Sequence, residues 1–423
     1  MTAKLSFYAF FVWILAVFFF FYEYFIRIVP ATISSNIIND MRISPSEFAL
    51  LGSAYYITYS LMQIPVGILY DRYGVRLFLT LACAICTLGV FGFAVAENFL
   101  SAFISRLLIG FGSSFGFISL LILALNWFPQ RYFAFLAGLG QMLGAVGPML
   151  AGAPVAMLMV LLNNNWRLLF TGISVFGIGL CVMIALFVRT KPKENREEVI
   201  YIKKETPLSK RLHQLLRIPQ VWLTMLYAGS IYVSLPLLGA YWGTLYLLTR
   251  GFERPSAALM VSMIWIGLAI GSPLIGRLSD HFHRRKPFLL IASLLGLASS
   301  LAILYLPLGH SQVALSVLFI ILGMAASGQS LSFATIADNV PEDLRATAIG
   351  ANNSAITLFA AIFPPLVTWV MQKGIVAHGQ YLASDFQVAF LLMPIAFGAA
   401  FLIALFGIQE TFCRSQQTIH YLG

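Results

Sequence analysis

Long apolar stretches alternate with short polar ones along almost the whole chain. A helix of about 20 apolar residues, rising ~1.5 Å per residue, crosses a hydrocarbon core of ~30 Å. The pattern therefore predicts an all-α membrane protein. It predicts twelve transmembrane helices, at residues 8–33, 47–70, 77–96, 99–125, 131–159, 166–188, 219–249, 256–278, 287–307, 311–337, 345–372 and 385–409.

One long polar stretch, Arg189 to Arg217, lies between the sixth and seventh spans. Its charges are too many to be buried in lipid, so it divides the chain into two parts. We predict an N-terminal six-helix bundle at 1–188 and an inter-bundle loop at 189–218. A pseudo-symmetric C-terminal six-helix bundle with a short tail follows at 219–423.

Composition strengthens the membrane assignment and removes one class of partner. The chain is 60% hydrophobic and 10% charged, with a mean hydropathy of +0.87, more apolar surface than one soluble core can hide. Its net charge of +10 is typical of a nucleic-acid binder, but the basic residues collect in alternate loops, which indicates membrane orientation instead. We expect a multi-pass protein of the bacterial inner (plasma) membrane with both termini cytoplasmic, no nucleic-acid partner and a monomeric state.

The first span and the cysteines carry two further expectations. The first span continues through Glu23 and Arg27 without a small-residue cleavage site, so it is expected to stay in the mature protein. The four cysteines lie in apolar spans or in the tail, and no pair suggests an extracellular domain held by disulfide bonds. We expect no structural disulfide.

The two halves of the chain repeat each other. Gly67, Asp71 and Arg72 follow the second span in the way that Gly276, Asp280 and Arg284 follow the eighth. The loops after the fourth and tenth spans also correspond, because three residue pairs share one offset: Pro129 with Pro341, Gly138 with Gly350, and Gln141 with Asn353. Internal repeats in a membrane chain are typical of carriers that bind a solute between two halves.

The loop motif Gly67-x3-Asp71-Arg72-x-Gly74-x-Arg76 resembles the loop between helices two and three of the major facilitator superfamily. With its second copy and the twelve spans, the resemblance covers essentially the whole chain and implies the major facilitator fold. An aspartate at a helix end, with arginines beside it, can pair in one transport state and release in another. The alternative is that these charges only anchor the loops. The expected gating residues are Asp71, Arg72, Arg76, Asp280 and Arg284.

Within that superfamily, the stretches YEYFIRIVPATISSNIINDMRIS, YYITYSLMQIPVGILYDRYGVR and WFPQRYFAFLAG are most similar to organic-anion and sugar-acid symporters. The resemblance implies that Arg27 meets a substrate carboxylate. The chain departs from that group at Ile26, where an acidic residue is usual, and at Ser113, where a glutamate carries the coupling proton. A fainter resemblance to lysosomal dipeptide transporters adds zwitterions to the substrate classes.

Three charged residues lie well inside the predicted spans: Glu23, Arg27 and Arg106. Such charges are costly in a bilayer, which makes each a functional candidate. Glu23 and Arg27 are four residues apart on one helix face. Our hypothesis is that Arg27 binds a carboxylate while Glu23 carries the driving proton; the alternative is a permanent pair that only locks the helix. Arg106 is expected either in the proton-linked network or bonded to backbone carbonyls of helices one or two.

Polar residues in otherwise apolar spans complete the candidate substrate site. Tyr55, Tyr59 and Gln63 follow each other at intervals of four, which places them on one helix face. The remaining candidates belong to helices five, seven, ten and eleven. The full set of expected substrate-binding residues is Arg27, Tyr55, Tyr59, Gln141, Tyr232, Gln329 and Asn353, with Glu23 and Arg106 for proton coupling.

We therefore expect a secondary active transporter that moves a small organic anion or zwitterion (an organic acid, amino acid or short peptide), with protons and the lipid bilayer as its other partners. An antiporter that exports amphipathic compounds or a siderophore is one alternative, because Gly147-Pro148-x-x-Ala151-Gly152 partly resembles an antiporter signature. A uniporter and a non-transporting membrane sensor are the others. No metalloprotease-type H-E-x-x-H or phosphate-binding loop occurs. We therefore expect that the protein is not an enzyme and that it binds no cofactor and no metal.

Overall fold

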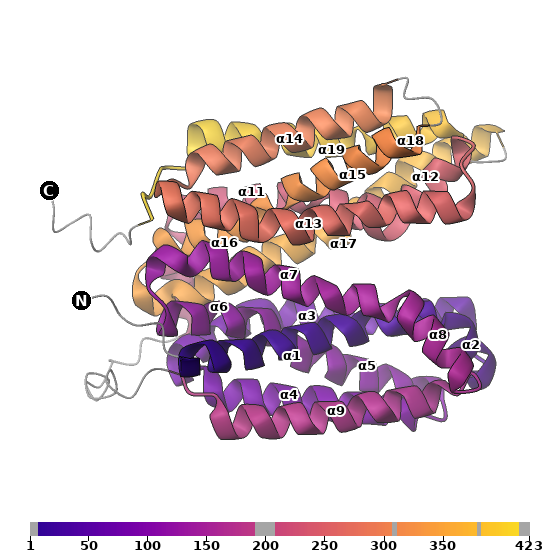
Figure 1. The fold of residues 1–423 in the computed structure, drawn as a ribbon, viewed down its shortest axis with the longest axis horizontal. Helices are drawn as coiled ribbons and strands as arrows, with labels where there is room; N and C mark the ends of the chain where they lie inside the picture. The colour runs from indigo at the N-terminus through magenta and orange to yellow at the C-terminus, as the bar shows by residue number, and fades with distance from the viewer. Residues whose placement is uncertain (1–6, 191–207, 307–310, 379–381, 414–423) are drawn as a thin grey trace, which may run out of the picture. The chain divides into compact units, whose positions relative to one another are not determined.

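The computed structural model describes residues 7–190, 208–306, 311–378 and 382–413, and all twelve predicted spans are helical in it (Figure 1). In the first half the helices are α1 (Phe7–Thr32), α2 (Ser34–Met41), α3 (Pro45–Tyr73), α4 (Val75–Ala94), α5 (Phe99–Ser113), α6 (Gly116–Trp127), α7 (Phe133–Ala151), α8 (Ala153–Leu161) and α9 (Trp166–Phe187). In the second half they are α10 (Leu208–Leu216), α11 (Pro219–Tyr232), a π-helix (Leu235–Trp242), α12 (Gly243–Thr249), α13 (Arg254–Phe282), α14 (Lys286–Tyr305), α15 (Gln312–Ala326), α16 (Gly328–Asp338), α17 (Arg345–His378), α18 (Ala383–Phe390), α19 (Leu392–Leu402) and a π-helix (Ile403–Gly407).

Among the described residues, eleven helical stretches are long and apolar enough to cross a membrane. The one predicted span not among these eleven is the second, 47–70. It lies within α3, which has 29 residues but a polar stripe that includes Tyr55, Tyr59 and Gln63. All three of these side chains are buried. The stripe therefore faces protein, as a polar face in a bilayer must.

The structure departs from the predicted spans at internal breaks. The fourth span is divided into α5 and α6 at Ser114 and Phe115, and the tenth into α15 and α16 at Ser327. The short helix α2 was not predicted, and α10 lies within the predicted inter-bundle loop. Periodicity misses such breaks because both sides of each are equally apolar. Residues 191–207, most of the predicted loop, lie outside the described part.

The chain forms two compact units. Unit 1 contains residues 1–129, 143–211 and 343–350, and unit 2 contains 130–142, 212–342 and 351–423. Helices pair in the same way inside each. In unit 1, α4 packs on α5 and α9, α3 on α5, and α1 on α6; in unit 2, α14 packs on α15 and α19, α13 on α15, and α11 on α16. The internal repeat of the sequence is thus a repeat of packing.

The repeated glycines mark backbone contacts inside each unit. A Cβ on Gly67 of α3 would overlap the Ala346 carbonyl of α17, and one on Gly276 of α13 would overlap the Ala134 carbonyl of α7. Gly138 and Gly350 are equally confined, against Ser272 and Gln63 respectively. These positions need glycine because the neighbouring backbone occupies the place of a side chain.

We expect Gly67→Val and Gly276→Val each to lower the free energy of unfolding by about 1–3 kcal/mol, because the added methyl groups overpack a backbone contact. The matched controls are Gly172→Val in α9 and Gly398→Val in α19, where a Cβ has no neighbour within 4 Å. Thermal unfolding of the purified variants measures the difference. Equal melting temperatures for a variant and its control would contradict the assigned contacts.

Candidate functional site

Glu23, Arg27 and Tyr55 form a closed hydrogen-bonded triad in unit 1. The Arg27 guanidinium donates from Nη2 to both carboxylate oxygens of Glu23, at 2.9 and 3.2 Å, and from Nε to the Tyr55 hydroxyl at 2.9 Å. That hydroxyl in turn donates to Glu23 Oε2 at 2.8 Å. The pair expected from the spacing in α1 is therefore present, and Tyr55 of α3 joins both charges.

Four tyrosine rings surround the Arg27 guanidinium. Its Cζ lies 4.6 Å from the ring centroids of both Tyr24 and Tyr59, 5.2 Å from that of Tyr55 and 6.0 Å from that of Tyr56. Such faces attract a cation, most strongly where water is excluded. The aromatic faces and Glu23 together stabilise a positive charge at membrane depth.

Glu23 and Arg27 differ in how deeply their side chains are buried. Glu23 is fully buried, whereas 12% of the Arg27 side chain is exposed. Two glycines make room for the triad: a Cβ on Gly110 of α5 would overlap Tyr55, and one on Gly116 of α6 would lie 3.2 Å from Glu23 Cγ. Arg27 is thus the partly exposed partner of the pair, and Glu23 is the buried one.

Arg106 of α5 also contacts this cluster, through the Tyr55 ring. It donates to the backbone carbonyls of Leu51 at 3.2 Å and Ile26 at 3.4 Å, and its Cζ lies 5.1 Å from the Tyr55 ring centroid. Leu51 is in α3 and Ile26 in α1. These contacts favour the packing alternative for Arg106, which ties α1 and α3 together beside the triad.

Ser113, the position where the resemblance implied a glutamate, lies in this cluster too. Its hydroxyl is 3.7 Å from the Cys86 thiol, and it interacts with Tyr55. Ser113 of α5 has no carboxylate, but Glu23 of α1 supplies one to the same cluster.

The remaining predicted substrate residues lie in unit 2. Gln329 is in α16, Asn353 in α17, Tyr232 at the end of α11 and Gln141 in α7. The structure joins two of these helices through residues next to the predicted ones: Asn352 Nδ2 donates to the Ser332 hydroxyl at 2.8 Å, which donates to the Gln329 carbonyl at 2.6 Å. The buried Gln141 Oε1 has no hydrogen-bond partner within the described residues.

The predicted gating aspartates both cap helix N-termini. In unit 1, the Asp71 carboxylate accepts from the backbone N–H of Ala346 at 3.1 Å and of Thr347 at 2.9 Å, and from the Thr347 hydroxyl at 2.6 Å. In unit 2, Asp280 accepts from the Phe135 N–H at 2.9 Å. A carboxylate at a helix N-terminus satisfies orphan N–H groups and the helix dipole. Each aspartate thus holds the first turn of α17 or α7.

The predicted gating arginines also make contacts away from these aspartates. Arg76 donates to the Ala185 carbonyl at 2.9 Å, Arg72 lies over the Tyr73 ring, and Arg284 over the Phe412 ring. The partner of Asp280 is instead Arg285, whose Nη1 donates to Asp280 Oδ1 at 2.6 Å. The sequence places Arg284 and Arg285 side by side, and only burial distinguishes them.

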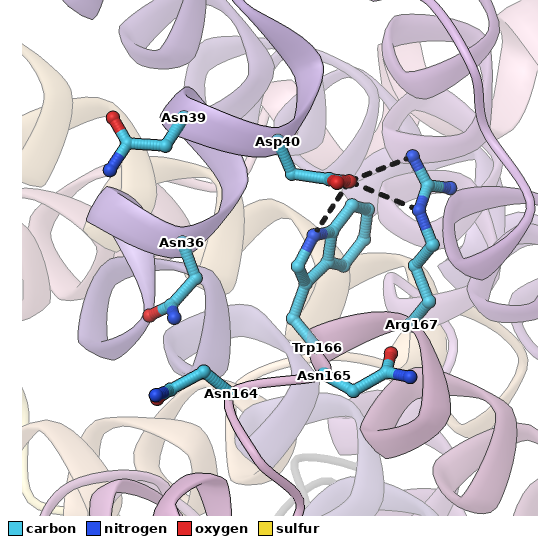
Figure 2. Close-up of a pocket in the computed structure, with 7 residues that line it drawn as sticks. All are labelled: Asn36, Asn39, Asp40, Asn164, Asn165, Trp166 and Arg167. Carbon is cyan, nitrogen blue, oxygen red and sulfur yellow. Dashed lines mark hydrogen bonds and ion pairs between the residues drawn. The ribbon is translucent and has the colours of Figure 1, made fainter.

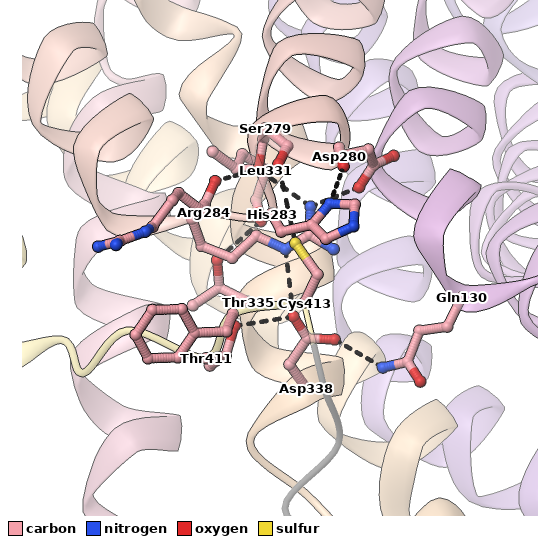
Figure 3. Close-up of polar contacts among 12 residues, drawn as sticks. Gln130, Ser279, Asp280, His283, Arg284, Leu331, Thr335, Asp338, Thr411 and Cys413 are labelled. Atoms are coloured by element: carbon pink, nitrogen blue, oxygen red, sulfur yellow. Dashed lines mark hydrogen bonds and ion pairs between the residues drawn. The ribbon is translucent and has the colours of Figure 1, made fainter.

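Arg285 also binds Asp338, a residue that was not predicted. Figure 3 shows Asp338 with Gln130 and Thr411 beside it. Arg285 Nε donates to Asp338 Oδ2 at 3.1 Å, while Gln130 and Thr411 donate to the same carboxylate at 2.8 and 2.9 Å. Burial opposes the charge of Arg285, but Asp338 and Asp280 more than offset this and raise its pKa. Asp338 is the last residue of α16. At the end of a span, the sequence alone does not distinguish an exposed loop carboxylate from a buried one.

The chain segments after α9 and after the last π-helix cap corresponding helices. Thr190 Oγ1 accepts from the backbone N–H groups of Val75 and Arg76 at the start of α4. Glu410 accepts from those of Arg285 and Lys286 at the start of α14, at 2.8 and 3.1 Å. The second cap is charged, which suits its position beside the Arg285 network.

We expect Arg285→Gln to lower the free energy of unfolding by about 3–5 kcal/mol, because it leaves the buried Asp280 and Asp338 without their shared cation. Arg284→Gln removes the same charge from an exposed side chain and serves as the matched control. Thermal unfolding in detergent measures both. A melting temperature for Arg285→Gln equal to that of the control would show that the network contributes nothing to stability.

A cavity of about 540 Å³ lies in unit 1, between α2 and the start of α9 (Figure 2). Its lining residues are Asn36, Asn39, Asp40, Asn164, Asn165, Trp166 and Arg167. Asp40 of α2 accepts from Trp166 Nε1 at 3.1 Å and pairs with Arg167 at 3.0 Å. Arg167 also donates to the Ala94 and Ala96 carbonyls. None of the predicted site residues lines this cavity, and its charges anchor α2 to α9.

Comparison with known proteins places these features in a family. The family model of the Major Facilitator Superfamily matches residues 12–364 and 249–412. The chain is 27% identical to a hexuronate transporter of Bacillus subtilis over 58% of each chain. It is 23% identical to a lysosomal dipeptide transporter of Danio rerio over 80% of this chain and 76% of the relative.

A solved structure of a proton:xylose symporter superposes with a TM-score of 0.75 at 16% identity, covering 99% of this chain and 100% of that one. At this identity the likeness shows the fold alone. The match to the hexuronate transporter spans only 58% of that protein's length.

Proposed function

Because the chain belongs to the major facilitator superfamily of membrane transporters, we propose that it is a proton-coupled symporter for a small organic anion. The observation that carries the proposal is the Glu23–Tyr55–Arg27 triad. A sugar acid is the substrate class that we favour, since a hexuronate transporter is among the relatives. The fainter likeness to a dipeptide transporter makes a zwitterion the second class.

Arg27 is the proposed carboxylate-binding residue. Its planar guanidinium can donate two parallel hydrogen bonds to a carboxylate, which a lysine cannot. In the structure these donors are held by Glu23 and Tyr55. A substrate carboxylate therefore has to compete with Glu23 for the same cation.

Glu23 is the proposed proton carrier. While deprotonated, it neutralises Arg27 and blocks the anion. Once protonated, it no longer holds Arg27, which turns to the substrate carboxylate; the cluster then carries one proton and one anion together. Release of the substrate leaves Arg27 uncompensated, so Glu23 gives up its proton and the pair reforms. Coupling in this scheme follows from the cost of an unpaired charge in the bilayer.

The capped helices α7 and α17 are the proposed moving parts. Asp71 holds the start of α17 and Asp280 the start of α7, through backbone N–H groups. These bonds can be broken and remade without changing the fold of either helix. We place this end of the protein on the cytoplasmic side of a bacterial inner membrane, as the distribution of basic loops suggests, and the working unit as a monomer.

The glycines of α7 that suggested an antiporter also have contacts with α1. Cβ atoms on Gly144 and Gly147 would overlap or crowd Phe20, Phe21 and Phe25 of α1. The close approach of α7 to α1 therefore accounts for Gly147 of the partial antiporter signature without an exporter function.

The experiment that tests the proposal uses the purified protein in liposomes that enclose a pH-sensitive dye. Hexuronates, other organic acids, amino acids and dipeptides are added one at a time. A solute that acidifies the lumen, with no effect in protein-free liposomes, supports symport. Equilibration of a labelled solute without a pH change would indicate a uniporter. Lumen alkalinisation on inward solute transport would indicate an antiporter, and binding without transport a sensor.

A further inference from the structure

Two thiols meet between α4 and α9, away from the residues used above. Cys83 of α4 points its Sγ at the Gly177 carbonyl of α9, at 3.9 Å, and Cys181 of α9 points its Sγ at the Thr80 carbonyl of α4, at 3.6 Å. Each thiol thus reaches across to the other helix. Gly177 lies about one turn before Cys181 and Thr80 about one turn before Cys83, so the two thiols lie at the same level of the contact between α4 and α9. Both are free.

The surroundings of this pair are apolar and membrane-embedded. Both residues lie within apolar membrane spans, Val75–Ala94 and Trp166–Phe187. Cys83 is fully buried, while Cys181 is partly exposed beside Ile178 and Val182, which are 57% and 50% exposed. A lipophilic neutral compound can therefore reach Cys181 from the bilayer.

We propose that Cys83 and Cys181 form a two-thiolate binding site for a divalent, thiophilic metal ion of linear coordination, the class to which mercuric ion belongs. Thiolates select soft metals. Within the described residues, no group of three or more histidine, cysteine or carboxylate side chains could complete a tetrahedral site, which zinc would require.

Charge balance favours a divalent ion over a monovalent one. Mercuric chloride, which is neutral, reacts with both thiols: two S–Hg bonds form, two Hg–Cl bonds break, and two protons and two chlorides leave. The product is neutral. A monovalent ion held by two thiolates would leave one negative charge in the bilayer, which is costly. No oxidant is needed, because neither sulfur nor mercury changes oxidation state.

The test compares two full-length double variants, each with two of the four cysteines. Cys86→Ser/Cys413→Ser keeps the proposed pair, and Cys83→Ser/Cys181→Ser keeps the other two thiols. Cys86 lies on α4 but faces Ser113, and burial raises the pKa of the Cys413 thiol in the tail to about 12. The thiol neighbouring Cys86 is Cys83, three residues away on α4, and the Cys83→Ser/Cys181→Ser variant removes it.

Each purified variant is incubated with equimolar mercuric chloride, washed with a monothiol, and measured by intact-mass analysis and mercury X-ray absorption. We expect the variant that keeps Cys83 and Cys181 to retain one mercury with two sulfur ligands, and the other to lose its mercury in the wash. Loss from the first variant, a single sulfur ligand in it, or equal retention by both would overturn the proposal. Circular dichroism of each variant establishes that it is folded.

Discussion

Glu23→Gln is expected to abolish substrate-driven proton uptake, to the level of protein-free liposomes. The amide keeps the size of the carboxyl group and can still accept a hydrogen bond from Tyr55, but it cannot take up a proton. It also no longer competes as an anion for Arg27. Exchange of labelled for unlabelled substrate across the membrane, which needs no net proton movement, is therefore expected to persist within a few-fold of the unmodified rate.

Comparing proton uptake with substrate exchange distinguishes a loss of proton coupling from a general loss of transport. Glu97→Gln, in an exposed loop, is the matched control and should leave both assays unchanged. Substrate-driven proton uptake by Glu23→Gln at the unmodified level would exclude Glu23 as the carrier. Loss of both uptake and exchange, together with a lowered melting temperature, would favour the alternative of a permanent structural pair.

Arg27→Lys is expected to raise the KM for substrate about 10- to 100-fold, the effect of losing one charge-assisted hydrogen bond of about 1.5–3 kcal/mol. Lysine keeps the positive charge but has no planar fork. It also keeps a cation beside Glu23, so the loss reports substrate geometry more than charge. Initial rates of uptake against substrate concentration measure KM directly.

Arg42→Lys, at an exposed position beyond α2, is the control for the Arg27 exchange. An unchanged KM in Arg27→Lys would rule out a two-pronged contact with the substrate carboxylate. A fall in maximal rate with unchanged KM would place Arg27 in the conformational cycle rather than in binding.

Several residues of the candidate site could be predicted from the sequence. A charge in an apolar span is rare because it is costly, so Glu23, Arg27 and Arg106 stand out, and the spacing of four predicted the Glu23–Arg27 contact that the structure shows. The faces of α3 were predictable in the same way. By contrast, Tyr55 as a bridge between Glu23 and Arg27, and Ser113 as a neighbour of Tyr55, depend on how α1, α3 and α5 pack.

The network around Arg285 shows what the sequence could not supply. Arg284 and Arg285 are adjacent and identical in type, and the direction of one side chain decides which meets Asp280 and Asp338. The motif indicated a gating role for Asp71, but it did not indicate that the Asp71 carboxylate caps α17 through backbone N–H groups. Backbone donors leave no trace in residue identity, so no pattern of side chains could have indicated them.

By itself the sequence determined the class of protein, the twelve spans and the internal repeat, because membrane insertion depends on local hydrophobicity and length, which can be read along the chain. It also marked the membrane-embedded charges. Only the tertiary structure decided which polar groups meet: the Tyr55 bridge, the caps on α7 and α17, the Arg285 network and the Cys83–Cys181 pair. These contacts join residues far apart in the chain, and their formation depends on helix rotation and close backbone approach.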